Sequence, residues 1–356
     1  MKKLLLLAMM AICILACQSQ TGTIKIIPVN IHEDSPVKLS EITEEIKKIS
    51  LELTDDDESL IGIITKVIYR DDRLIIYDGG KTSKVLLFDS EGKYIRQIGR
   101  RGQGPGEYNG INDIAYDKSE HIIFIATYGK ILCYNTEGVF LHECKTHSPE
   151  YIYFQDGYMN LFSTRFGVKV EDGYLNQTTL YRMDRKCNQV DSIIVKSVIL
   201  NRLSGATFPQ MDYMSEVNSQ TFLYYPVLTA ESIVRDTLYE LKERIMIPFL
   251  KLRFSDERAT SSSGNKTKNL TNIWRSERFV IANYQNKDGN FCFMHDLKTG
   301  HSANMRDGFD DDIHHSGKVN IRPLGENYFY YIFTPGLTDE NLKEEPNPDI
   351  YIGKLL

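Results

Sequence analysis

The sequence predicts an all-β protein, a six-bladed β-propeller whose last blade is closed by a strand from the N-terminal part of the chain. Three observations support this fold class: short runs of β-branched and aromatic residues, turn residues between the runs, and repetition of the units. Runs such as LIIYD (74–78) and YFYYIF (328–333) are too short for helices. The intervals between them show no sustained 3.6-residue apolar period, which excludes a helical fold.

The first two repeats are the clearest. LIIYD is followed by VLLFDSEGKYIRQI (85–98), and HIIFIAT (121–127) is followed by ILCYNTEGVFLHEC (131–144). FDSEG and YNTEG superpose, and both combine an Asp or Asn, which can cap its own backbone, with a Gly that tolerates a positive φ. Each unit therefore reads as strand, tight turn and strand. Units of this kind recurring at roughly 40–50 residues are typical of propeller blades.

Four more units follow with weaker similarity. They begin at YMNLFST (158–164), FLYYPVLTAESIVR (222–235), RFVIANYQ (278–285) and YFYYIFT (328–334). The last unit lacks room for a full set of strands before Leu356, so we expect IKKISLELT (46–54) to supply the missing strand and close the ring. Closure would remove an open sheet edge. Three stretches outside the blade rhythm are predicted to be loops: 199–220, 255–269 and 334–349.

The N-terminus predicts export. Lys2 and Lys3 precede a 13-residue apolar run that is too short to span a membrane but has the length of a signal peptide. The stretch ILAC, ending at Cys17, resembles a bacterial lipobox, although Leu15 is bulkier than the usual residue. We therefore divide the chain into a signal peptide (1–16), a lipid-anchored linker (17–40) and a propeller (41–356), with SPVKLSEITEEIKKI (35–49) starting as a helical turn capped by Ser40.

Charge argues against a nucleic-acid partner. The chain carries 42 Lys and Arg against 48 Asp and Glu, a formal charge of −6, which becomes −8 when the two signal-peptide lysines are removed. Nucleic-acid binding needs a basic face. The uncharged segment CQSQTG after the lipobox favours a periplasmic orientation on the outer membrane.

The glycine-rich stretch IGRRGQGPGEY (98–108) is predicted to be a structural joint. It has neither the Lys-Ser/Thr pair of a phosphate-binding P-loop nor the helix that follows a dinucleotide fingerprint. Gly102, Gly104 and Gly106 permit tight backbone turns and Pro105 stiffens the path, as a blade-to-blade crossover requires. Arg100 and Arg101 are candidate contacts for a carboxylate or sulfate, or alternatively form an ion pair with Glu107.

This stretch and the preceding LLFDSEGKYIRQIG resemble the NHL-like six-bladed propeller lipoproteins of gut Bacteroidetes. The resemblance is strong over residues 60–145, and after residue 145 it rests only on the spacing of the repeated strand units. It implies export, a lipid anchor and a disk-shaped binding scaffold, and it supplies no catalytic residues.

The sequence offers no strong metal or catalytic motif. RDGFDDDIHHSG (306–317) brings Asp310, Asp312 and His314 together, but its spacing is not that of a calcium loop, so Ca²⁺ is only a weak candidate. Gly-x-Ser-x-Gly and His-Glu-x-x-His are absent from the sequence. Cys133, Cys144, Cys187 and Cys292 have no Cys-x-x-Cys spacing, and the three possible pairings stay open. We favour buried free thiols, because Cys133 and Cys144 lie in apolar strands.

Three functions are consistent with these features. The favoured one is a non-enzymatic, membrane-anchored propeller that binds a protein or glycan partner at the cell envelope. The alternative is an enzyme resembling the metal-dependent propeller lactonases and lyases, whose ligands enter the central channel from several blades. Convergence of His, Asp or Glu from at least three blades at one channel mouth would favour the enzyme, whereas an exposed apolar rim patch would favour a subunit of an envelope complex.

Overall fold

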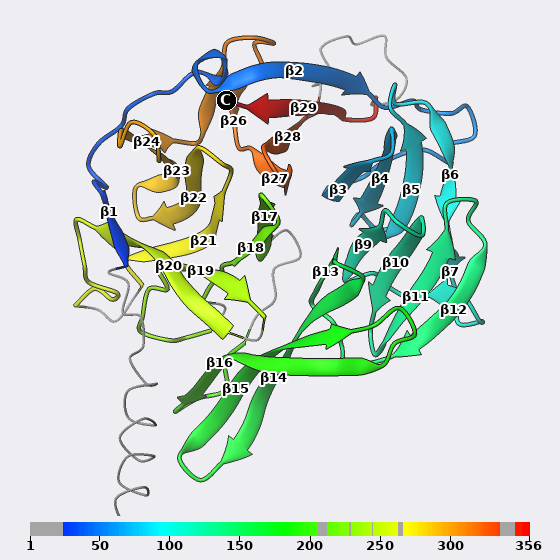
Figure 1. The fold of residues 1–356 in the computed structure, drawn as a ribbon, viewed down its shortest axis with the longest axis horizontal. Coiled ribbons are helices and arrows are strands. Elements are labelled where there is room, and N and C mark those ends of the chain that lie inside the picture. The colour runs from blue at the N-terminus through cyan, green and yellow to red at the C-terminus, as the bar shows by residue number, and fades with distance from the viewer. Residues whose placement is uncertain (1–23, 206–211, 228, 244, 263–265, 335–345) are drawn as a thin grey trace, which may run out of the picture.

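The computed structural model is an all-β ring of six four-stranded blades around a central axis, which confirms the predicted fold class (Figure 1). The structure describes residues 24–205, 212–227, 229–243, 245–262, 266–334 and 346–356. The signal peptide and Cys17 lie outside these residues. Among the described residues, no helix has the length and apolar character needed to cross a membrane.

Each blade is an antiparallel sheet in which the first strand lies innermost. Blade 1 consists of β3 (Ile64–Arg70), β4 (Arg73–Asp78), β5 (Lys84–Asp89) and β6 (Tyr94–Ile98). Blade 2 consists of β9 (Asp113–Asp117), β10 (Ile122–Thr127), β11 (Lys130–Asn135) and β12 (Phe140–Lys145). Blade 3 consists of β13 (Tyr151–Gln155), β14 (Tyr158–Val170), β15 (Gly173–Met183) and β16 (Gln189–Leu200).

Blade 4 consists of β17 (Met214–Val217), β18 (Gln220–Leu223), β19 (Thr237–Lys242) and β20 (Ile245–Phe254). Blade 5 consists of β21 (Lys268–Arg275), β22 (Phe279–Asn286), β23 (Gly289–Asp296) and β24 (Ser302–Arg306). Blade 6 consists of β27 (Arg322–Gly325), β28 (Tyr328–Phe333), β29 (Asp349–Leu355) and β2 (Thr43–Ser50). Two short pairs lie outside the blades: β7 (Arg100–Arg101) with β8 (Glu107–Tyr108), and β25 (Phe309–Asp311) with β26 (Gly317–Val319).

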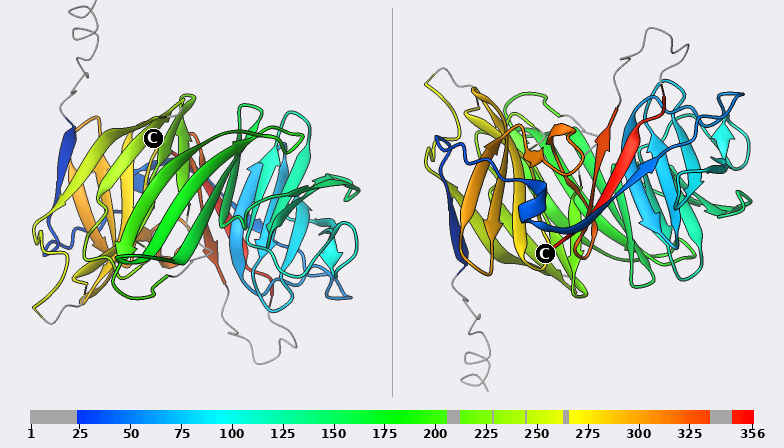
Figure 2. Two further views of the ribbon diagram at one scale, coloured as in Figure 1. Left: turned by 90° about the horizontal axis from the view of Figure 1, so that it is seen from below. Right: turned by 90° about the horizontal axis from the view of Figure 1, so that it is seen from above.

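The ring closes as the sequence predicts. β2 pairs antiparallel with β29, from Thr43 opposite Leu355 to Ser50 opposite Asp349, and the two strands run side by side in both figures of the fold (Figures 1 and 2). Blade 6 therefore combines the two ends of the described chain. Its outer edge is filled by a strand from the N-terminal part of the sequence.

The N-terminal segment also packs before residue 41, inside the range predicted to be a linker. β1 (Lys25–Val29) adds a fifth, parallel strand to β20 of blade 4. The chain then crosses blade 5, where Ser35 N–H donates to the carbonyl of Asn304 at 2.7 Å. Ile27 and Val29 are buried against blade 4, whereas Ile26 and Pro28 are exposed, and this one-sided burial explains why the segment joins the sheet.

Two further local predictions differ from the structure. A short 3₁₀ turn, η1 (Leu39–Glu41), forms before β2, but Ser40 lies inside it, and its side chain bonds Asp312 rather than capping the turn. The stretch 199–220, predicted to be a loop, contains β17, the innermost strand of blade 4. β17 has only four residues and faces a polar channel, so it carries no long apolar run that the sequence could reveal.

The core consists of six apolar clusters in the described residues, one between each pair of neighbouring blades. Leu86 and Phe88, for example, face blade 6, whereas Val85 and Leu87 on the same strand face blade 2. Alternate residues of a strand point to opposite faces, and each face meets another blade. The middle strands are therefore apolar on both faces.

Candidate functional site

The central channel holds a cavity of about 310 Å³. It is lined by the innermost strands of five blades, β3, β9, β13, β17 and β27, and by the turns that follow some of them. Its exposed lining residues, Lys118, Ser119 and Asp156, come directly after β9 and β13. The channel pocket, as we call this cavity, therefore opens on the face of the disk where the innermost strands end.

Two buried ion pairs form its inner end. Lys66 Nζ lies 2.9 Å from both carboxylate oxygens of Asp113, and also donates to the carbonyl of Ile152 at 3.3 Å. Arg322 Nε donates to Asp212 at 3.0 Å, and its Nη1 donates to the carbonyl of Thr65 at 2.7 Å. These bonds connect strands of blades 1, 2, 3 and 6 with the residues that lead into blade 4.

Burial shapes the electrostatics of these pairs. Desolvation raises the pKa of Asp113, and the charge of Lys66 opposes this rise. Desolvation would lower the pKa of Arg322, but the attraction of Asp212 outweighs it and the pKa is raised. Lys66 also lies 4.5 Å from the centre of the Tyr151 ring, a cation–π contact. Each charge at the inner end thus has an opposite charge within the protein.

Nearer the opening, polar side chains are held by hydrogen bonds between blades 3 and 4. Tyr153 Oη donates to Glu216 at 3.0 Å, and Gln155 Nε2 donates to the other Glu216 oxygen at 3.2 Å. Burial raises the pKa of Tyr153. Arg70 crosses to blade 6 and donates to the carbonyl of Leu324 at 2.6 Å. These contacts fix the side chains in place before any ligand arrives.

One lining hydroxyl has no partner among the described residues. Ser215 on β17 is 4% exposed, and its Oγ makes no hydrogen bond there. A buried hydroxyl without a partner costs free energy, because it has lost its water. Because Ser215 is a lining residue of the pocket, a ligand or water molecule that reached its Oγ would supply the missing hydrogen bond.

The acidic groups that reach the pocket do not form a metal cluster in the described part of the chain. Asp212 is paired with Arg322, Asp117 with Arg185 at 2.5 Å, and Glu216 accepts from two neutral donors. The described residues contain one group with the spacing of metal ligands, Cys133, His142 and Cys144, and it lies on blade 2 away from the pocket lining.

The glycine-rich stretch lies between β6 of blade 1 and β9 of blade 2, as expected for a crossover. Glu107 lies within it: Arg100 donates to one carboxylate oxygen at 2.6 Å and the N–H of Gly104 donates to the other at 2.8 Å. Gly106 has φ +72°, and its position against the Phe140 ring leaves no room for a Cβ. Arg101 is exposed. Neither arginine lines the channel pocket, so a ligand contact there stays a prediction.

The acidic stretch after residue 306 forms hydrogen bonds with the segment that precedes β2. Asp310 pairs with Lys318 at 2.9 Å, whereas Asp312 accepts from the backbone and side chain of Ser40. His314 packs against the Tyr351 ring with 4.7 Å between ring centres. The three weak metal candidates therefore contact different partners.

The cysteines differ in part from the prediction. Cys144 on β12 forms a disulfide with Cys187, which lies in the turn between β15 and β16 of blade 3, so the expectation of a free thiol at Cys144 was wrong. Cys133 and Cys292 are free and buried. The bonded pair is 43 residues apart and belongs to different blades, so only the packing of blade 2 on blade 3 brings it together.

The channel residues were not found from the sequence. Lys66, Asp113, Asp212 and Arg322 are single charged residues within or beside short strands, and Lys66 and Arg322 are 256 positions apart. The available signal was the charge itself, since an unpaired Lys or Asp in an apolar strand needs a buried partner. The identity of the partner depends on the ring.

One solved structure supports the fold, and a second is reported for comparison. A protein from Bacteroides fragilis described as exported has 18% identity and a TM-score of 0.68, with 93% of this chain and 100% of that chain covered. A Bacteroides caccae protein of unknown function has 12% identity and a TM-score of 0.40, with 78% of this chain and 88% of that chain covered. No curated protein matches. Residues 22–356 match the family described as Domain of unknown function (DUF4934), and the chain belongs to this family.

Proposed function

We propose that this protein is exported, anchored to the membrane through a lipid on Cys17, and acts at the cell envelope as a binding module whose channel pocket receives part of a glycan. The observation that carries the proposal is the channel pocket: at about 310 Å³ it lies at the lower end of small-molecule sites. Likeness to an exported Bacteroides protein supports the export part.

The charge balance favours an uncharged ligand. The lining contains Lys66, Arg70 and Lys118 against Asp117, Asp156, Asp212 and Glu216, so there is no excess of positive charge to attract an anion. Lys66 and Asp212 are moreover neutralised by buried partners. A sulfated or carboxylated ligand would have to compete with these internal pairs.

The side-chain chemistry favours a sugar. Tyr116, Tyr153 and Phe154 contribute half-buried aromatic rings to the lining, and Gln155, Ser119 and Ser215 contribute hydrogen-bonding groups. A pyranose has apolar C–H faces that pack on rings and hydroxyl edges that need donors and acceptors. A protein loop is the other occupant that we considered, and the binding test distinguishes the two.

The direction of β1 relates the channel pocket to the anchor. β20 is antiparallel to the innermost strand β17, and β1 is parallel to β20, so Lys25 lies on the face where β17 ends. This is the face on which the pocket opens. Only seven residues, 18–24, separate Cys17 from Lys25, a reach of about 25 Å at full extension. The proposed anchor thus orients the pocket opening toward the membrane.

Binding can be tested by calorimetry with neutral mono- and oligosaccharides, and with sulfated and uronic acid oligosaccharides for comparison. We expect neutral sugars to bind and Ser215→Ala to weaken binding about tenfold, roughly 1.4 kcal/mol, because it removes the unpartnered hydroxyl. Tyr128→Ala is the matched control, since Tyr128 is 88% exposed and lies outside the pocket lining. Absence of saccharide binding at millimolar concentration, or equal affinity in Ser215→Ala, would contradict the glycan proposal.

Orientation can be tested separately with the lipidated protein in vesicles that contain a quencher in the bilayer. A fluorophore at Lys118→Cys, on the pocket face, should be quenched more than one at Tyr128→Cys, in the β10–β11 turn on the opposite face. Equal quenching would contradict the orientation and leave the binding proposal standing.

Asp117, Asp156 and Glu216 do bring carboxylates from blades 2, 3 and 4 to the channel pocket, which is the convergence expected of an enzyme. Binding is favoured over catalysis because Asp117 is paired with Arg185, and Glu216 accepts hydrogen bonds from Tyr153 and Gln155.

A further inference from the structure

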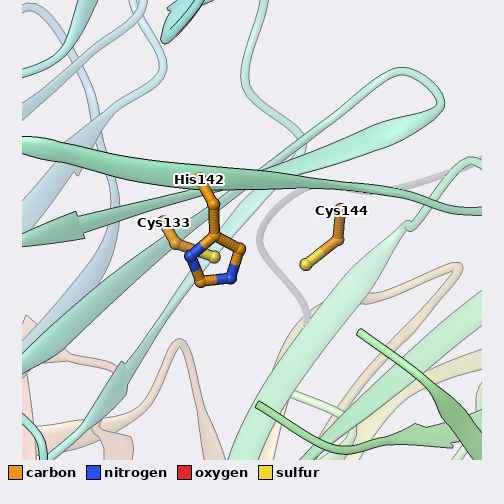
Figure 3. A group of neighbouring side chains, drawn as sticks. All are labelled: Cys133, His142 and Cys144. Carbon is orange, nitrogen blue, oxygen red and sulfur yellow. The ribbon is translucent and has the colours of Figure 1, made fainter. Parts of the chain in front are cut away.

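Blade 2 carries a cluster of soft metal ligands that is independent of the channel pocket. Cys133, His142 and Cys144 each offer a ligand atom, and these atoms lie within 4.8 Å of one another (Figure 3). Within the described ranges this is the one group of three such residues with that spacing. Cys133 and Cys144 are buried, and His142 lies on the outer strand of the blade.

The register of two neighbouring strands produces this cluster. Cys133 on β11 is directly opposite His142 on β12, and Cys144 follows His142 by two residues. Directly opposed residues, and residues two apart on one strand, project from the same face of a sheet. That face packs on blade 3, because Cys133 and Cys144 belong to the apolar cluster between blades 2 and 3.

A fourth ligand comes from blade 3. Cys187 is bonded to Cys144, with the two Cα atoms 5.5 Å apart, and its side chain packs against the same apolar cluster. Three cysteines and one histidine thus converge from two blades. Cys₃His is one of the ligand sets of structural zinc sites. The sequence could not indicate it, because the ligands are separated by 8, 1 and 42 residues.

We propose that reduction of the Cys144–Cys187 disulfide opens a Cys₃His site that binds a thiophilic divalent cation such as Zn²⁺. A dithiol or phosphine reductant supplies two electrons, the S–S bond breaks, and two thiols form. Binding of Zn²⁺ then displaces the protons of Cys133, Cys144 and Cys187, while His142 donates a ring-nitrogen lone pair. The disulfide and the metal compete for the same two sulfurs.

The geometry requires only a small adjustment. In a tetrahedral site with Zn–S bonds of about 2.3 Å and a Zn–N bond of about 2.0 Å, neighbouring ligand atoms lie about 3.5–3.8 Å apart. The ligand atoms of Cys133, His142 and Cys144, which lie within 4.8 Å of one another, must therefore approach by about 1 Å. The sulfurs of Cys144 and Cys187 must move apart once their bond is broken.

The experiment titrates Co²⁺, a spectroscopic substitute for Zn²⁺, into the purified protein before and after reduction with a phosphine. The reduced protein should bind one Co²⁺ per chain with a thiolate-to-cobalt charge-transfer band whose intensity corresponds to three thiolates, and Zn²⁺ should displace it. The oxidised protein should show no such band. Failure of the reduced protein to bind one equivalent would overturn the proposal.

Variants identify the ligands. Cys133→Ser should reduce the band by a third and weaken affinity at least tenfold. His142→Asn should weaken affinity at least tenfold and keep all three thiolates. Because His142 is exposed, this substitution should not disturb folding, so weaker binding would report the loss of a ligand. Cys292→Ser is the control, because Cys292 is a buried free thiol of blade 5 outside the cluster. If Cys133→Ser and His142→Asn bind Co²⁺ like the unsubstituted protein, the site is not this cluster.

Discussion

Single charged residues at the inner end of the channel depend on their buried partners. The side chains of Lys66 and Asp113 are 13% and 6% exposed, so each is a charge that water no longer stabilises. Removing one partner of a buried pair leaves the other uncompensated, at a cost of about 3–5 kcal/mol. The Lys66–Asp113 pair therefore matters more as a condition for closing the channel than as a net source of stability.

Asp113→Ala should lower the free energy of unfolding by about 3–5 kcal/mol, measured by urea denaturation at pH 7. Asp310→Ala is the control, because Asp310 and its partner Lys318 are 39% and 36% exposed and such pairs contribute about 1 kcal/mol or less. Equal effects of the two substitutions would show that burial of the channel pair is overestimated.

Asp296 should contribute a specific acid sensitivity. The hydrogen bond from Arg278, at 2.8 Å, holds the pKa of Asp296 well below its usual value, helped by the N–H groups of Lys298 and Thr299. Because the folded-state pKa is depressed, this stabilisation is fully present above the unfolded value of about 3.9 and is lost as the pH falls below it.

Asp296→Asn should therefore be less stable at pH 7 by about 1.5–3 kcal/mol, the value of a hydrogen bond to a charged group. The difference in the free energy of unfolding between the variant and the unsubstituted protein should become smaller between pH 4 and pH 2. Urea midpoints at pH 7, 4 and 3 measure it. A gap that is independent of pH would rule out the ionised carboxylate as its cause.

At the scale of elements, the Cys144–Cys187 disulfide connects the outer strand of blade 2 to a turn of blade 3. A link that closes a loop of this length typically stabilises a protein by about 2–4 kcal/mol. The double variant Cys144→Ala/Cys187→Ala should lose that amount in urea denaturation without reductant. Reduction of the unsubstituted protein in metal-free buffer should lose a similar amount. An unchanged midpoint in both cases would mean that blade packing alone holds this contact.

The elements that the sequence predicts are those with a strong apolar pattern. Leu74–Asp78 and Ile122–Thr127 are middle strands buried on both faces, and both are evident as β-rich runs. β17 was missed because its four residues face a polar channel on one side. β1 was missed because five residues next to a predicted anchor resemble a linker, and only the exposed edge of β20 makes them a strand.

The candidate site belongs to the whole molecule, which explains why the sequence did not predict it. Its lining comes from five blades, and each blade contributes short polar segments that look like ordinary turns. Similarly, the joint at Gly102–Gly106 could be predicted from its glycine content. The sequence could not decide whether Arg100 binds a ligand or pairs with Glu107, as it does in the structure. Local chemistry predicts blades, and the ring decides which side chains meet.

Ring closure should control folding of the whole domain. Deleting residues 349–356 removes β29 with Ile350, Tyr351 and Leu355, and so exposes the rest of the apolar clusters on both sides of blade 6. We expect loss of the cooperative unfolding transition and binding of a hydrophobic dye, monitored by circular dichroism and fluorescence. Deleting Leu356 alone, which is 40% exposed, should change stability by about 0.5 kcal/mol or less. A cooperative transition in the longer deletion would show that five blades suffice.

The pairing of β2 with β29 also sets an order of events in time. Thr43 is synthesised early, and its partner Leu355 comes 312 positions later, almost last. Contacts so distant in sequence form late, because the loop between them must first be closed. A growing or translocating chain therefore carries an unpaired β2 until its final residues emerge, and an open strand edge is prone to wrong pairing. A modification of the N-terminus that took place before the last residues emerged would therefore meet a chain whose ring has not yet closed.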